Sequence, residues 1–127
     1  MKPSLLFILS AIYLAIGGLG LLLVPHALTM GILPANASVA LTGLARGLGA
    51  TLLAIATLNA LVRNHPASKT RDAVFLGNTV GFGLNAINDI MIQLSGTAPS
   101  EGWGFVVLDV LFTIGFIWVG KKNMSTA

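Results

Sequence analysis

The sequence predicts an all-α fold, an antiparallel four-helix transmembrane bundle with both termini in the cytoplasm. Of its 127 residues, 55% are hydrophobic and only 9% are charged, whereas an ordinary soluble domain is about one quarter charged. Four stretches reach the length of about 20 mainly apolar residues that a membrane-crossing helix needs. The basic residues, with one exception, lie at the chain ends and in one connecting segment, the pattern typical of cytoplasmic regions.

The chain is long enough for one integral membrane domain, residues 1–127, with four spans. The expected spans are about 4–24, 39–62, 73–94 and 103–120. The absence of cysteine excludes disulfide exchange, thiolate catalysis and cysteine-ligated metals. The net charge of +3 is small and follows the predicted topology, so we expect no nucleic-acid partner.

The first span, residues 4–24, begins after Lys2 and ends before Pro25. It resembles a secretory signal, but its apolar run is longer than a signal core and no Ala-x-Ala cleavage site follows, which favours a retained helix. Gly17 and Gly18 would allow a neighbouring helix to approach closely. Gly20 adds to this small-residue face.

Residues 25–38 are too short and too interrupted to cross a membrane. Pro25 suits the first turn of a short helix and Pro34 would end it. We expect an interfacial segment that lies over the outer end of the bundle.

The second and third spans, residues 39–62 and 73–94, each contain two glycines four residues apart. These pairs are Gly43 with Gly47, and Gly77 with Gly81. Such pairs are typical of close helix contacts in membranes. The strongly polar segment 63–72 separates the two spans.

The fourth span, residues 103–120, follows the turn-rich segment 95–102. Trp103 and Trp118 lie near its two ends, where aromatic side chains anchor helices at the membrane surface.

Six of the seven basic residues set the predicted orientation. They are Lys2, Arg63, Lys69, Arg71, Lys121 and Lys122. The first and third connections contain no Lys or Arg, so the positive-inside rule places both termini in the cytoplasm. The seventh basic residue, Arg46, lies inside a span.

Three polar residues of the third span form a stripe. At 100° per residue, Asn78, Asn85 and Asp89 fall within about 40° of one another on one helix face. An unpartnered amide or carboxylate in hydrocarbon costs several kcal/mol, so this face must point into the protein or a wet cavity.

Arg46, Asp89 and Asp109 lie at similar depths below the outer surface when each span rises 1.5 Å per residue. An intramembrane charge costs about 2.5–3.5 kcal/mol, so the sequence predicts an Asp89–Arg46–Asp109 cluster. A guanidinium group can hold two carboxylates at once. The excess negative charge would leave a proton on one carboxyl group, an arrangement that suits acid/base chemistry.

Further polar and aromatic residues are expected to line a cavity beside this cluster. The candidate substrate-binding residues are Tyr13, His26, Asn78, Asn85 and Thr113. A cavity that is polar at its outer end and apolar below would take an amphipathic or largely apolar ligand. We expect no cofactor and no metal site, because His26 and His65 lie on opposite sides of the membrane.

Each of these residues also has a purely structural interpretation. The three charges could form an ion-pair network that only joins helices. Asn78 and Asn85 could make interhelical hydrogen bonds, Tyr13 could pack in the core, and His26 could be an interfacial residue. Asn59 and Asn88 lie off the two polar faces and are expected to contact helices.

The segments GLARGLGATLLA and GWGFVVLD, with an Asn/Asp-bearing third span between them, resemble DoxX-like and related small four-helix membrane proteins of bacteria. This resemblance implies a four-helix bundle in a bacterial inner membrane. The Asp-Arg-Asp grouping is similar in residue types to the site of limonene-type epoxide hydrolases. It implies that one carboxylate activates water, the other protonates the epoxide oxygen, and arginine bridges them, although that family is soluble and has another fold.

Three functions are open at this point. The first is a membrane-embedded acid/base enzyme, of epoxide hydrolase, cyclase or isomerase type, acting on an epoxide, terpenoid or lipid. Asp89 and Asp109 would share the acid and base roles, Arg46 would orient them, and Tyr13 and Asn85 would position water or substrate. The second is a proton- or cation-coupled transporter or ligand-binding membrane subunit, as a homodimer. The third is a structural or accessory subunit in which the charge cluster only holds helices together. Membrane lipids are expected partners in each case.

Overall fold

The computed structural model describes residues 1–124, and all regular structure within them is helical. Four long helices are joined by short segments, two of which contain a short helix. The elements are α1 (Pro3–Leu23), α2 (Pro25–Leu28), α3 (Val39–Val62), α4 (Lys69–Leu94), η1 (Ser100–Gly102) and α5 (Trp103–Asn123). The predicted all-α class is confirmed.

Three helical stretches are long and apolar enough to cross a membrane: α1, α3, and Ser100–Asn123, which combines η1 with α5. They support the prediction of a helical membrane protein. Helix α4 is long enough but more polar, because it carries charged residues in its first turn and a polar stripe near its end.

The helix boundaries follow from local chemistry. The Ser38 hydroxyl accepts a hydrogen bond from the Leu41 amide at the start of α3, and the Ser68 hydroxyl accepts one from the Arg71 amide at the start of α4. Serine is a favoured N-cap because it pairs an otherwise free helical N–H. The cap at Ser68 explains why α4 begins four residues before the span predicted at 73.

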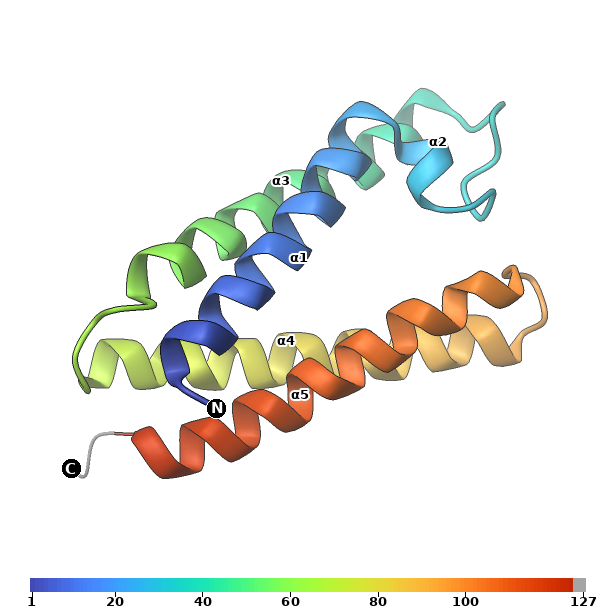
Figure 1. The fold of residues 1–127 in the computed structure, drawn as a ribbon. Helices are drawn as coiled ribbons and strands as arrows, with labels where there is room; N and C mark the ends of the chain where they lie inside the picture. The colour runs from blue at the N-terminus through green and yellow to red at the C-terminus, as the bar shows by residue number, and fades with distance from the viewer. Residues whose placement is uncertain (125–127) are drawn as a thin grey trace.

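The long helices form two pairs, α1 with α3 and α4 with α5. Figure 1 shows that the pairs approach each other where α1 begins and α5 ends, and diverge toward the end that holds α2 and the α4–α5 connection. The fold is therefore closed at one end and open at the other.

Backbone contact between Gly18 and Gly49 brings α1 and α3 together. A Cβ atom added at Gly18 would lie 2.8 Å from the Gly49 carbonyl oxygen, and one added at Gly49 would lie 2.7 Å from the Gly18 oxygen. The predicted close contacts at the two Gly-x-x-x-Gly pairs of α3 and α4 are absent. A Cβ atom at Gly43, Gly47, Gly77 or Gly81 meets no atom within 4 Å, because all four glycines lie on exposed faces.

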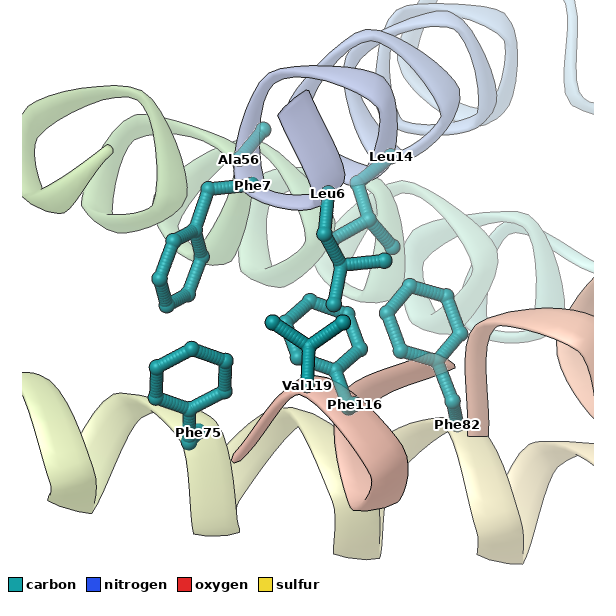
Figure 2. Close-up of a cluster of buried hydrophobic side chains, with 8 residues drawn as sticks. All are labelled: Leu6, Phe7, Leu14, Ala56, Phe75, Phe82, Phe116 and Val119. Atoms are coloured by element: carbon teal, nitrogen blue, oxygen red, sulfur yellow. The ribbon is translucent and has the colours of Figure 1, made fainter. Parts of the chain in front are cut away.

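Apolar side chains from all four long helices fill the closed end and the middle of the fold (Figure 2). The cluster contains Leu6, Phe7, Leu14, Ala56, Phe75, Phe82, Phe116 and Val119. The Phe7 and Phe75 ring centroids are 4.7 Å apart, and those of Phe82 and Phe116 are 5.7 Å apart. The rings continue through Phe112, which stacks 4.8 Å from Phe82.

An amide pair joins α3 to α4 beside this aromatic cluster. The Asn59 side chain donates to Asn78 Oδ1 at 2.8 Å, and Asn78 donates back to Asn59 Oδ1 at 2.7 Å. Asn59 also donates to the Ser10 hydroxyl of α1 at 2.9 Å. The expectation that Asn59 contacts another helix is confirmed, and three helices share one buried polar contact.

Candidate functional site

A cavity of about 370 Å³ lies between the two helix pairs at the open end of the fold. Residues from α1, α3, α4 and α5 line it, and the segment that follows α2 covers part of it through Thr29, Met30 and Ile32. The lining is mainly apolar. Its polar members are Tyr13, Thr29, Asn85, Asn88, Asp89, Gln93 and Asp109.

Helical spacing explains which side chains reach the cavity. On α4, Asn85, Asn88, Asp89 and Ile92 follow one another at intervals of three, one and three residues and share one face. On α5, Phe105 and Asp109 lie four residues apart, about one helical turn, and both line the cavity. Two residues of the predicted stripe of α4, Asn85 and Asp89, therefore line the cavity.

Asp109 is the most deeply buried polar group of the site. Its side chain is 3% exposed, and its Oδ1 atom has no hydrogen-bond partner within residues 1–124. The Tyr13 hydroxyl is directed at the same carboxyl group as a hydrogen-bond donor. Asp109 therefore lines the cavity with a carboxyl group of which one oxygen has no partner.

Asp89 lies close enough to Asp109 for the two charges to act on each other. Its side chain is half-buried, and its Oδ1 accepts a long bond of 3.5 Å from the neighbouring Asn88 amide. Asp89 of α4 and Asp109 of α5 thus line the same cavity.

Tyr13 separates the cavity from the aromatic core. Its ring stacks 5.3 Å from Phe112 and 6.1 Å from Phe82, measured between centroids, while its hydroxyl faces Asp109. The expected packing of the Tyr13 ring is confirmed, and Tyr13 also lines the cavity.

Arg46 does not join the two carboxyl groups, and that part of the predicted cluster is wrong. The Arg46 side chain is exposed, does not line the cavity, and forms no ion pair with a carboxylate in the described part of the chain. Around α3 it lies about 80° from Ala56, which faces α1 and the core. The cavity lies between the pairs, whereas this side of α3 turns outward.

Three of the predicted substrate-binding residues also lie outside the cavity lining. Asn78 is occupied by its amide pair with Asn59. The Thr113 hydroxyl donates to the Asp109 carbonyl oxygen at 2.7 Å, a bond within its own helix. The His26 Nδ1 atom lies 3.3 Å from the Leu33 carbonyl oxygen and ties together the segment around α2. Of the five, Tyr13 and Asn85 reach the cavity.

Sequence reasoning missed three polar lining residues, Thr29, Asn88 and Gln93. Asn88 lies about 60° from Asn85 around α4, and the cavity is wide enough to include both. Asn88 would have been predicted as a lining residue if a wider face of α4, with residues at three- and four-residue intervals, had been considered instead of one narrow stripe.

No protein-family model, curated protein or solved structure matches the chain. The resemblance to DoxX-like proteins thus has no support from these comparisons. Within residues 1–124, no group of three or more His, Cys, Asp and Glu side chains is placed to hold a metal ion.

The chemistry of the site follows from its own groups. Two carboxyl groups, one phenol and several amides line one end of an apolar space. Such a site can hold a polar head group while apolar walls cover an attached tail. Its carboxyl groups can also exchange a proton for a bound ligand.

Proposed function

We propose that this protein binds an amphipathic small molecule within the membrane, as a ligand-binding or proton- or cation-coupled transport protein. The cavity between the helix pairs carries this proposal, because its apolar walls converge on Asp89 and Asp109. Its volume of about 370 Å³ lies within the usual range of about 300–1,000 Å³ for small-molecule sites.

The proposal includes four antiparallel membrane spans. Helices α3 and α5 are apolar enough to cross a membrane, and α4 joins the end of α3 to the start of α5 while packing along α5. If α3 and α5 cross, α4 must cross between them. Its polar residues Asn85, Asn88 and Asp89 line the cavity, where polar side chains of a membrane helix are expected to lie.

The basic residues give the orientation. Arg63, Lys69, Lys121 and Lys122 all lie near the closed end of the fold, where α3 ends, α4 begins and α5 ends. By the positive-inside rule this end is cytoplasmic, so the cavity lies in the outer half of the membrane. A bacterial inner membrane is the location that the DoxX-like resemblance implies.

Binding is favoured over epoxide chemistry because Arg46 lies away from the carboxyl pair. Without a guanidinium bridge, the resemblance to limonene-type epoxide hydrolases loses one of its three groups. Acid/base catalysis by Asp89 and Asp109 is the second candidate, and the Tyr13 hydroxyl directed at Asp109 favours it.

Photolabelling of purified protein in phosphatidylcholine nanodiscs tests ligand binding. Two probes share a twelve-carbon chain with a diazirine group and end in either a hydroxyl group or a primary amine. We expect at least one probe to label the cavity walls saturably, with excess unlabelled compound competing, as measured by peptide mass spectrometry.

A pair of tryptophan substitutions on α3 provides the control. Leu48 lines the cavity and is 54% exposed, so Leu48→Trp should fold and fill the space. Leu44 lies one turn away, is 72% exposed and is not part of the lining. Leu48→Trp should reduce saturable labelling at least fivefold and Leu44→Trp less than twofold. Labelling by neither probe, or equal labelling of both variants, would contradict the proposed function.

A further inference from the structure

We infer that the head group held in this cavity is a cation, an organic ammonium group seated between Asp89 and Asp109. The inference rests on the proposed function and adds the charge of the ligand. It depends on three observations, namely the sign of the cavity charge, an unpartnered buried oxygen, and the aromatic and apolar surroundings.

The cavity has charged groups of one sign only. Asp89 and Asp109 line it, whereas no Lys, Arg or His of the described chain does. Arg46, the cation that sequence reasoning placed here, is exposed on α3. Two carboxylates that line one cavity repel each other, and this repulsion is relieved by a proton or a bound cation. An anionic head group would add to the repulsion.

The two carboxyl groups also have few donors, namely the Tyr13 hydroxyl at Asp109 and the Asn88 amide at Asp89. Asp109 is nine-tenths or more buried, and its Oδ1 has no partner within the described residues. Asp89 receives one long bond from Asn88. An ammonium group brings up to three N–H donors as well as positive charge, so one head group can satisfy oxygens of both residues. A hydroxyl head has one donor and no charge.

The surroundings suit an amphipathic cation. Tyr13 and Phe105 line the cavity beside the acidic pair, and aromatic ring faces attract ammonium groups. Ile16, Leu48 and Ile92 provide apolar wall farther along, where an alkyl or ring system of the ligand would lie. The predicted ligand class is therefore a lipophilic amine.

The two photolabelling probes described above measure this preference directly, because they differ only in the head group. A primary alkyl amine is ionised at pH 7, and phosphatidylcholine nanodiscs carry no net charge that would concentrate it. In the unmodified protein, the concentration for half-maximal labelling should be at least tenfold lower for the amine than for the alcohol.

Single acid-to-amide variants show which carboxyl group produces the preference for the amine probe over the alcohol probe. Asp109→Asn should reduce the tenfold preference to less than threefold. Asp89→Asn should weaken it as well, and because Asp89 is only half-buried this variant is expected to keep the fold. Glu101→Gln removes an exposed acid near the same end of the molecule that does not line the cavity, and it should keep the full preference. Thermal unfolding of each variant confirms that it is folded.

The outcomes separate this inference from the proposed function. Equal binding of the amine and alcohol probes would overturn the cationic head group while leaving the binding cavity intact. A preference that persists in both Asp89→Asn and Asp109→Asn would also overturn it. Saturable labelling by neither probe would instead contradict the proposed function itself.

Discussion

Two kinds of buried polar residue have opposite roles in this molecule. Asn59 and Asn78 exchange two hydrogen bonds, and Asn59 adds a third to Ser10, so their polar atoms are satisfied within the protein. Asp109 is equally buried but keeps one oxygen without a partner. The satisfied amides stabilise helix contacts, whereas the unsatisfied carboxyl group is the better candidate for binding.

Replacing Asn59 by alanine should lower stability without affecting the cavity. The change leaves the buried Asn78 amide without its reciprocal partner, which costs about 1–3 kcal/mol in free energy of unfolding. Unfolding in detergent micelles, followed by circular dichroism, measures the loss. Asn64→Ala, in the exposed connection between α3 and α4, is the control and should change stability by less than about 0.5 kcal/mol. Equal stability of the two variants would show that the amide pair contributes nothing.

At the scale of the helices, sequence patterns indicated how far along its helix each residue lies. They were less informative about which face of the helix the residue occupies. The bounds of α3, residues 39–62, agree with the prediction because Ser38 and the polar segment after Val62 mark its ends. The stripe of α4 was predicted because its polar residues recur on one face. Asp89 and Asp109 could be assigned to one site because their spans place them at similar depths in the membrane.

Rotation about the helix axis was the property that sequence patterns failed to predict for α3. The Gly43/Gly47 pair and Arg46 were assigned to an interior face, yet all three are exposed. The face that contacts α1 carries Gly49 and Ala56 instead. In a helix that is apolar nearly all round, small residues occur on several faces, so one Gly-x-x-x-Gly pair does not show which face has the partner.

Glycine-to-alanine variants of α3 test this rotation. Gly49→Ala puts a Cβ atom 2.7 Å from the Gly18 carbonyl oxygen, so α1 and α3 must separate, at a cost of about 1–3 kcal/mol. Gly47→Ala meets nothing within 4 Å and should be neutral or stabilise by up to about 1 kcal/mol, because alanine favours helix. Thermal unfolding midpoints measure both. A lower midpoint for Gly47→Ala than for Gly49→Ala would contradict the observed helix contact.

At the scale of the whole molecule, the closed and open ends have different chemistry. Aromatic rings and the amide pair fill the closed end and the middle, and most basic residues lie beyond them. The cavity with its acidic pair occupies the open end. If the end that holds most of the basic residues is cytoplasmic, as proposed, the acidic pocket lies toward the outer side of the membrane.

Single introduced cysteines test whether the chain crosses the membrane four times. The chain suits this method because its sequence contains no cysteine. Ala35 and Ser100 are exposed in the connections at the open end, and Ala67 is exposed in the connection at the closed end. Four spans with the positive end inside predict that a membrane-impermeant maleimide labels Ala35→Cys and Ser100→Cys in intact bacterial spheroplasts. Ala67→Cys should be labelled only after the membrane is permeabilised. If α4 did not cross, Ser100→Cys and Ala67→Cys would lie on the same side of the membrane. Both would then be labelled, or both protected, in intact spheroplasts. Labelling of Ala67→Cys alone would keep the four spans and reverse their orientation, which would place the acidic pocket in the cytoplasmic half.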